Sequence, residues 1–459
     1  MSFLSTYKPH YQRNLAIAIP IILSQAGQML TGIVDNIMVG RVGTTSLAAA
    51  SLANSVFFNI IIFGIGFTFG LTPLIGTASA RKEVRKVGEL LSQSLLINML
   101  LGVLIFIVLF FGSPLIHLMS QPENVVELAI PYFNIIGLSF IPMMFFLTFK
   151  QFTEGLSITK PAMVATITSN IINIILNYIL IYGKMGFEPM GLNGAGWATL
   201  ISRVTMGVLL ALWVFQSKKC KIYTQFYKWL LLKKETALNL VKMGMPIGFQ
   251  FTLEVAAFSI GTIMLGWIGE VQLAAHQIAL SMASLTYMMA NGLASATTVR
   301  VSNLYGENNF KEVRNAGVAS LHLVVVYMAF CGLLFYLFNK ELPVMFVEDP
   351  EVLTVAANLL IFAAFFQIFD GVQVVAIGSL RGLSDVTSPT YIAFFSYWVC
   401  SLPSGYLLAF HFGLNEYGVW MGFCIGLAIA SVLLVMRFFK THKKMSLQYG
   451  QSLAKPIEA

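Results

Sequence analysis

The chain has 459 residues, of which 57% are hydrophobic and only 10% charged, and its mean hydropathy is +0.78. Soluble domains carry about 25% charged residues, so this composition excludes a soluble protein and indicates a membrane protein without a soluble domain. The net charge of +8 is compatible with nucleic acid binding, but its distribution along the chain, described below, argues against that partner.

Twelve apolar runs follow one another along the chain, each long enough for the roughly 20 residues that a membrane-spanning helix needs. They lie at residues 14–38, 48–79, 90–111, 127–149, 162–183, 192–215, 238–265, 273–303, 317–338, 352–378, 389–410 and 414–437. The polar N-terminus leads into the first run without a small-residue cleavage site, so we expect no removable signal peptide. The expected fold is an all-α polytopic membrane protein with twelve transmembrane helices.

Lysine and arginine gather in alternate joints between these runs. The basic residues on one side include Lys8, Arg13, Lys150, Lys228, Lys233, Arg381, Arg437 and Lys455, whereas the other side has only Arg41, Lys184 and Lys340. Basic loops stay in the cytoplasm, so we expect both termini there. The excess indicates contact with anionic membrane lipid and no nucleic acid partner.

The sequence also contains an internal repeat. "MVGRVGTTSLAAASLA" (38–53) returns as "MLGWIGEVQLAAHQIA" (264–279), 226 residues later, and "GLSITKP" (155–161) resembles "GLSDVTSP" (382–389). The repeat predicts two six-helix bundles inserted in the same orientation, as in parallel-repeat transporters. The predicted domains are an N-terminal lobe (1–215), a basic cytoplasmic linker (216–237), a C-terminal lobe (238–445) and a cytoplasmic tail (446–459).

Three acidic residues fall within the predicted spans, namely Asp35, Glu254 and Asp370, and Arg203 is the only cation in mid-span. A charge at the centre of a bilayer costs at least about 2.5–3.5 kcal/mol, so an intramembrane acid is a functional candidate by default. Arg203 can neutralise one acid or extend toward the membrane surface, but it cannot neutralise all three.

Polar residues recur beside these acids at helical spacing. The stripes and flanking residues are Ser24, Gln28, Thr31 and Asp35; Thr166, Asn170, Asn173 and Asn177; Ser284, Tyr287, Asn291, Ser295 and Thr298; Gln250 before Glu254; and Gln367 and Gln373 around Asp370. We expect them to line a substrate cavity rather than face lipid. The alternative is that they only join helices by hydrogen bonds.

Burial disfavours the charged form of a carboxylate and a nearby cation favours it, so such a group can exchange H⁺, Na⁺ and a cationic substrate. Asn173 and Asn177 add neutral oxygens that suit a hard cation, and Thr199 offers a hydroxyl, which makes Asp35, Asn173 and Asn177 the Na⁺ candidate. No nucleotide-binding motif is present, so we expect an ion gradient as energy source, no enzyme activity and no cofactor. The four cysteines lack metal-ligand spacing, and we expect them to be apolar filler.

Four stretches together resemble the multidrug and toxic compound extrusion (MATE) family, specifically its NorM-like branch. They are "DNIMVG" (35–40), "EGLSITKP" (154–161), "MPIGFQFTLE" (245–254) and "FDGVQVVAIGSLRGLSD" (369–385). The resemblance implies two bundles that alternate between inward-open and outward-open states and export amphiphilic organic cations in exchange for Na⁺ or H⁺. It also assigns Asp35, Asn173, Asn177 and, less closely, Thr199 to an N-lobe ion cluster, and Glu254 and Asp370 to C-lobe acids.

One departure from the family pattern is Phe366, where some NorM-like members carry a tyrosine, which puts a C-lobe Na⁺ site using that hydroxyl in doubt. His276 fits a packed or hydrogen-bonded residue better than a proton carrier. The expected protein is a monomeric transporter of small lipophilic cationic drugs or dyes in a bacterial plasma membrane. The rival functions are a lipid-linked precursor flippase, whose anionic cargo needs a basic cavity, and a non-transporting receptor or scaffold.

Overall fold

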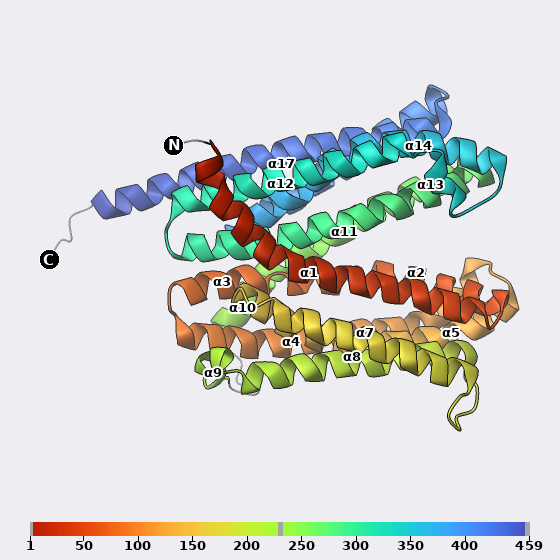
Figure 1. Cartoon of the computed structure of the whole chain (residues 1–459), viewed down its shortest axis with the longest axis horizontal. Helices are drawn as coiled ribbons and strands as arrows, with labels where there is room; N and C mark the ends of the chain where they lie inside the picture. Colours follow the sequence, from red (N-terminus) through yellow and green to blue (C-terminus); the bar gives the residue numbers. More distant parts are fainter. Residues whose placement is uncertain (1–2, 228–232, 455–459) are drawn as a thin grey trace. The chain divides into compact units, whose positions relative to one another are not determined.

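The computed structural model describes residues 3–227 and 233–454, which form helices joined by short turns and contain no strand (Figure 1). Lys228 and Lys455, with the surrounding parts of the predicted linker and tail, lie outside the described residues. The all-α prediction is confirmed.

Eleven helical segments of the described chain are long and apolar enough to cross a membrane. They are Thr6–Gly40, Thr44–Ala80, Val84–Met119, Glu123–Gly155, Lys160–Tyr182, Gly191–Gln216, Lys234–Ile268, Phe310–Leu337, Pro350–Gly382, Thr387–His411 and Asn415–Gln451. The remaining predicted run is helix α11 (Glu270–Gly306), whose 37 residues exceed the length that a membrane requires. The polar stripe of α11 lowers its hydropathy, which explains why composition alone does not mark it as a span.

By its internal contacts the chain divides into two compact units, Leu23–Gly248 and the remainder, which joins the N-terminus up to Ile22 to the chain from Phe249 onward. The helices of the first unit are α1 (Phe3–Gly40, second half), α2 (Thr44–Thr68), α3 (Leu71–Ala80), α4 (Val84–Gly112), η1 (Ser113–Met119), α5 (Glu123–Leu138), α6 (Phe140–Gly155), α7 (Lys160–Tyr182), α8 (Gly191–Gln216), α9 (Lys218–Thr224) and the start of α10 (Lys234–Ile268). Helix α8 packs against α6 and α7, and α2 against α5.

The second unit contains the rest of α1 and α10 and all later helices. These are α11, α12 (Phe310–Leu337), α13 (Glu341–Val344), α14 (Pro350–Gly382), α15 (Thr387–Ala393), η2 (Phe394–Ser401), α16 (Leu402–Tyr406), η3 (Leu407–His411) and α17 (Asn415–Ala454). Helix α14 packs along α11, α12 and α17. Its start is fixed locally, because the Asp349 carboxylate accepts the backbone N–H of Glu351 at 2.8 Å and Pro350 occupies the first helical position.

The first half of α1 belongs to the second unit because polar contacts hold it there. Asn14 is fully buried and donates to the Ala316 carbonyl at 3.1 Å and to the Ser320 hydroxyl at 2.7 Å, while Arg300 donates to the Asn14 amide oxygen at 3.2 Å. The start of α10 is held in the first unit in the same way, since the Lys233 backbone N–H donates to Gln93 at 3.1 Å. Relative to the predicted lobes, the first half of α1 therefore lies with the C-terminal helices, and the start of α10 lies with the N-terminal helices. The boundaries of the lobes stay a prediction.

The sequence repeat also appears in the geometry of each unit. Gly155 at the end of α6 and Gly382 at the end of α14 have little room for a side chain, because an added Cβ would lie 3.0 Å from the carbonyl oxygen of Thr72 or Thr298, respectively. Ser157 and Ser384 both follow with φ of 62°. The "GLS" motif therefore ends two equivalent helices in the same backbone conformation.

Close helix packing gives a first testable prediction. In α14, a Cβ added to Gly378 would lie 2.4 Å from the Ala294 carbonyl of α11, so the helices must separate to admit alanine. We expect Gly378→Ala to lower the free energy of unfolding by about 1–3 kcal/mol, measured as a lower unfolding temperature in detergent. Gly112→Ala is the matched control, because nothing lies within 4 Å of that added Cβ. Equal stability of the two variants would contradict this packing.

Candidate functional site

The unit Leu23–Gly248 encloses a cavity of about 420 Å³ between α1, α2, α5, α6, α7 and α8. Six of the residues predicted from the sequence line it: Gln28, Thr31, Asp35, Asn170, Asn173 and Thr199. The spacing of four, three and four residues within each polar stripe places these side chains on one face of α1 and one face of α7. The cavity wall is completed by apolar and aromatic side chains, among them Phe57 and Tyr132.

Asp35 is tied to α7 by a charge-assisted hydrogen bond. The Asn177 amide donates to the Asp35 Oδ1 at 2.5 Å and also to the Asn173 Oδ1 at 3.1 Å. Asn173 in turn donates to the Ser202 hydroxyl at 3.4 Å, and Ser202 donates to the Thr199 carbonyl at 3.0 Å. The predicted N-lobe residues therefore form one connected chain from α1 through α7 to α8.

The donor set of this chain suits a hard cation. Asp35 supplies carboxylate oxygens, and the buried Asn177 Oδ1 has no hydrogen-bond partner among the described residues. Buried carbonyl oxygens without a donor are costly unless they meet a donor or a cation. Within the described residues no group of three or more His, Cys, Asp and Glu side chains is placed to hold a metal. Any cation here would therefore depend on one carboxylate and neutral oxygens.

Arg203 on α8 faces the same cavity. Its Nη1 donates to the Ser139 hydroxyl at 2.7 Å, and its guanidinium carbon lies 5.6 Å from the centre of the Phe57 ring. Both partners hold the side chain inside the helix bundle rather than extended toward the membrane surface. The cavity thus holds one acid and one base on different helices.

The second unit gathers the other predicted acids and amides around Glu254. Gln250 and Gln373 donate to the Glu254 Oε1 at 3.0 and 3.2 Å. Arg381 donates to the Gln250 Oε1 at 3.2 Å and stacks 5.0 Å from the Phe251 ring centre, and the Tyr397 hydroxyl donates to the Gln373 Oε1 at 2.9 Å. The Gln250 amide therefore links Arg381 to Glu254 through two hydrogen bonds.

Asp370 and Gln367 lie one turn apart on α14, and both are buried. Neither polar atom of the Gln367 side chain has a hydrogen-bond partner among the described residues. Phe366 packs against Phe258 and Trp420, with ring centres 6.1 and 5.7 Å apart, and offers no hydroxyl. Tyr287 on α11 lies within electrostatic range of Glu254 and Asp370, whereas Asn291 is only half-buried one turn further on.

Comparisons with known proteins complete the site description. The MatE family model matches the chain twice, over residues 20–179 and 246–407, at the offset of the sequence repeat. The chain belongs to the MATE family. It is 33% identical to the probable multidrug resistance protein NorM of Rhizobium meliloti, covering 96% of both chains, and 32% identical to the multidrug resistance protein NorM of Vibrio cholerae, covering 95% of this chain and 97% of the relative.

The fold matches that of a solved family member, the eukaryotic MATE transporter AtDTX14, with a TM-score of 0.86 at 20% identity, covering 96% of this chain and 99% of that one. The NorM-like branch and the fold of twelve transmembrane helices in two bundles are thereby confirmed. Helix α11 corresponds to the eighth of the twelve predicted runs, despite its polar stripe.

Three charged residues lie buried at the ends of helices, beyond the apolar runs that predicted the spans of this MATE chain. Glu154, near the end of α6, is 2% exposed. Lys150 on α6 and Arg381 on α14 are 7% and 5% exposed, although both were expected in loops. The apolar runs end six residues before α6 does and four residues before α14 does, so hydropathy alone does not mark the ends of these helices.

Several cavity residues were not predicted at all. Asn54 on α2 accepts a hydrogen bond from the Tyr132 hydroxyl at 3.5 Å, and Asn36, Ser169 and Ser202 complete the polar wall. None of the four belongs to the polar stripes spaced four, three and four residues apart, so that spacing does not mark them. His276 is fully buried, shares a hydrogen bond with the Thr262 hydroxyl at 3.0 Å and packs against Trp420, which agrees with a packed histidine.

Cys220 gives a prediction outside the membrane-spanning segments of this MATE protein. The thiol is fully buried on α9, and burial raises its pKa to about 11. Because only the thiolate attacks a maleimide, we expect Cys220 to stay unlabelled at pH 7 and to react only as the pH approaches that value. Lys221→Cys, exposed on the same short helix, is the control that should label fast. Rapid labelling of Cys220 at pH 7, shown by peptide mass spectrometry, would contradict its burial.

Proposed function

We propose that this protein is a secondary active antiporter that exports amphiphilic organic cations in exchange for Na⁺ or H⁺. The observation that carries the proposal is the cavity of about 420 Å³ with the Asp35 carboxylate in its wall. Its volume lies within the roughly 300–1,000 Å³ typical of small-molecule sites. The relatives' names, multidrug resistance protein NorM, support export of drugs in general.

The composition of the cavity wall supports a broad range of substrates. Met29, Met143 and Met206 line it together with Phe57 and Tyr132. Methionine side chains are flexible and polarizable and adapt to different apolar shapes. Aromatic faces attract organic cations, and Asp35 supplies the charge that selects a cation over a neutral compound.

Coupling follows from competition at one carboxylate. Asp35 can bind either the coupling cation, together with Asn173 and Asn177, or the positive group of a substrate. It cannot bind both at once with the full affinity that it has for either alone. The two cations can drive the alternation between outward-open and inward-open states only if they bind those states with different affinity. In the second unit, Glu254 and Asp370 form a second acidic locus whose charge Arg381 partly balances, which favours a proton or a substrate cation over Na⁺ there.

The proposed setting is the plasma membrane of a bacterium, with both termini in the cytoplasm, as the basic loops indicate. We propose a monomer in contact with anionic lipid, with the two lobes and the linker as the repeat divides them. Neither a cofactor nor catalysis enters this proposal.

The proposal is tested in proteoliposomes loaded with a fluorescent lipophilic cation. An inward Na⁺ gradient and an inward proton gradient are applied in separate arms, with protein-free liposomes as control. We expect one gradient to drive dye out faster than in the control, which also identifies the coupling ion. If neither gradient moves the dye, but an anionic amphiphile moves, the flippase alternative replaces cation export, with Arg203 as its binding group.

A further inference from the structure

A second buried cluster lies in the unit Leu23–Gly248, beyond the cavity. Lys150 and Glu154 on α6 form an ion pair, with Nζ and Oε1 3.8 Å apart, and the two side chains are only 8% and 3% exposed. Neighbouring Gln151 is 1% exposed and accepts a hydrogen bond from the Thr72 hydroxyl at 2.6 Å. The Gln151 Nε2 is buried and has no hydrogen-bond partner among the described residues. None of these groups takes part in the cavity described above.

The polar stripes of α1 and α7 run from the cavity to a second contact between these two helices. Asp35 and Asn177 join the two helices at one end, and Ser24 and Thr166, with hydroxyl oxygens 3.0 Å apart, join them at the other. Each pair is separated by 142 residues, so the two contacts are in register. Eleven residues of helix separate them, which is about 16 Å.

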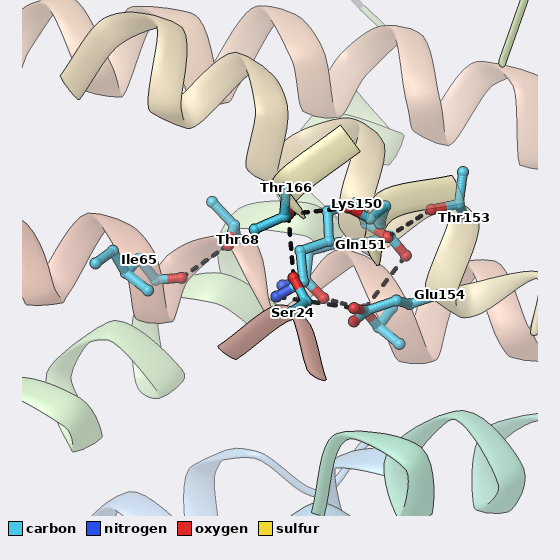
Figure 2. A network of polar contacts seen from close by, with 10 residues as sticks. Ser24, Ile65, Thr68, Lys150, Gln151, Thr153, Glu154 and Thr166 are labelled. Atoms are coloured by element: carbon cyan, nitrogen blue, oxygen red, sulfur yellow. Dashed lines mark hydrogen bonds and ion pairs between the residues drawn. The ribbon is translucent and has the colours of Figure 1, made fainter. Parts of the chain in front are cut away.

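Figure 2 shows Ser24, Gln151, Lys150 and Glu154 pointing toward one another between the helices, at the Ser24–Thr166 contact. This is the end of the unit at which α6 ends and α7 begins. The basic loops predict that end to be cytoplasmic. Polar side chains therefore follow α1 and α7 from Asp35 to the Ser24–Thr166 contact, beside which Figure 2 places the buried ion pair.

We propose that Lys150 and Glu154 form an exit site for the coupling cation, a proton or Na⁺, on its way from Asp35 to the cytoplasm. The proposal rests on the proposed antiport function. The Lys150 ammonium is the resident counter-ion of Glu154; the arriving cation binds the Glu154 carboxylate in its place and then leaves to water, after which the ion pair forms again. The unpartnered Gln151 amide hydrogen-bonds the carboxylate while the ammonium is displaced.

Two physical arguments favour this role over a purely structural ion pair. A buried ion pair contributes little net stability, because desolvation of both charges offsets their attraction, and a well-packed apolar pair is often as stable. The repeat supplies the second argument. The position equivalent to Glu154 in the "GLS" motif is Arg381, so the second unit has a cation where this unit has an acid. The second unit therefore has no carboxylate at this position to bind an arriving cation, so the exit site belongs to this unit alone.

The test compares the double variant K150M/E154M with the wild type in the dye-loaded proteoliposomes, in both the Na⁺ and the proton arm. Removing both charges together avoids leaving one of them buried and unpaired. We expect the variant to fold, to bind the dye and to exchange internal for external dye at the wild-type rate without a gradient. Gradient-driven efflux should fall by about tenfold or more. The control K86M/E83Q removes an exposed ion pair of the same unit and should leave both rates unchanged.

Each outcome decides the proposal. Gradient-driven efflux at the wild-type rate would show that Lys150 and Glu154 are a structural ion pair only. An equal fall in dye exchange and in gradient-driven efflux would show that the ion pair is needed for the conformational change and not for cation release. That result would also overturn the proposal. If the double variant does not fold, the single variants E154Q and K150M are tested instead. For each, the ratio of gradient-driven efflux to dye exchange is compared with that of the wild type. Failure of the wild type itself to transport under either gradient overturns the proposed antiport instead.

Discussion

Asp35→Asn is expected to reduce gradient-driven efflux of an organic cation by about 10- to 150-fold while leaving the protein folded. The substitution keeps the shape of the side chain but removes the negative charge in the cavity wall with which a bound cation would pair. A hydrogen bond to a charged group contributes about 1.5–3 kcal/mol, and every 1.4 kcal/mol corresponds to a factor of ten. The measurement is the initial efflux rate from dye-loaded proteoliposomes under the gradient that drives the wild type.

The matched control for Asp35 is Glu188→Gln, which removes an acid from an exposed position between α7 and α8. That variant should transport at the wild-type rate, so a loss in Asp35→Asn alone identifies a local role of the cavity acid. Wild-type efflux by Asp35→Asn, at equal reconstituted amount, would remove Asp35 from the coupling mechanism.

Arg381→Met is expected to lower the free energy of unfolding by about 1–3 kcal/mol, because it leaves the buried Gln250 amide oxygen without its donor and the half-buried Glu254 without a compensating charge. Arg381 is 5% exposed and reaches Glu254 through the Gln250 amide, with bonds of 3.2 and 3.0 Å. Combining it with Glu254→Gln should restore part of the stability, since the two groups belong to one network. Unfolding temperatures of the single and double variants in detergent measure this coupling.

Arg437→Met provides the comparison for Arg381. Its guanidinium pairs with Asp385 at 2.7 Å but is 40% exposed, and such surface pairs contribute only about 0–1 kcal/mol. If Arg381→Met is no more destabilising than Arg437→Met, or if its effect simply adds to that of Glu254→Gln, Arg381 does not balance Glu254.

Helical spacing predicted the cavity better than hydropathy predicted the ends of the spans. Asp35, Asn170 and Asn173 line one cavity because residues three and four apart share a helix face. The burial of Glu154 and Arg381 was not predicted, because their helices continue six and four residues past the apolar runs, where neighbouring helices still bury them. Burial of a charge depends on partners from distant parts of the chain, which spacing along one helix does not reveal.

Contacts between distant parts of the chain are not marked in the sequence either. Asn14 holds the first half of α1 against Ala316 and Ser320, more than 300 residues away. The two halves that the repeat predicts stay a prediction. A single buried asparagine in the first half of a helix gives no sequence signal for its partner. The contacts among α1, α11 and α12 therefore emerge only from the folded chain.

The most direct measurement of the central claim follows dye efflux and cation entry in the same proteoliposomes. If Asp35 exchanges one cation for the other, addition of dye should stimulate inward flow of Na⁺ or H⁺, the two fluxes should rise together, and Asp35→Asn should abolish both. Dye efflux that continues without any reciprocal cation flow, in the wild type under either gradient, would contradict the account.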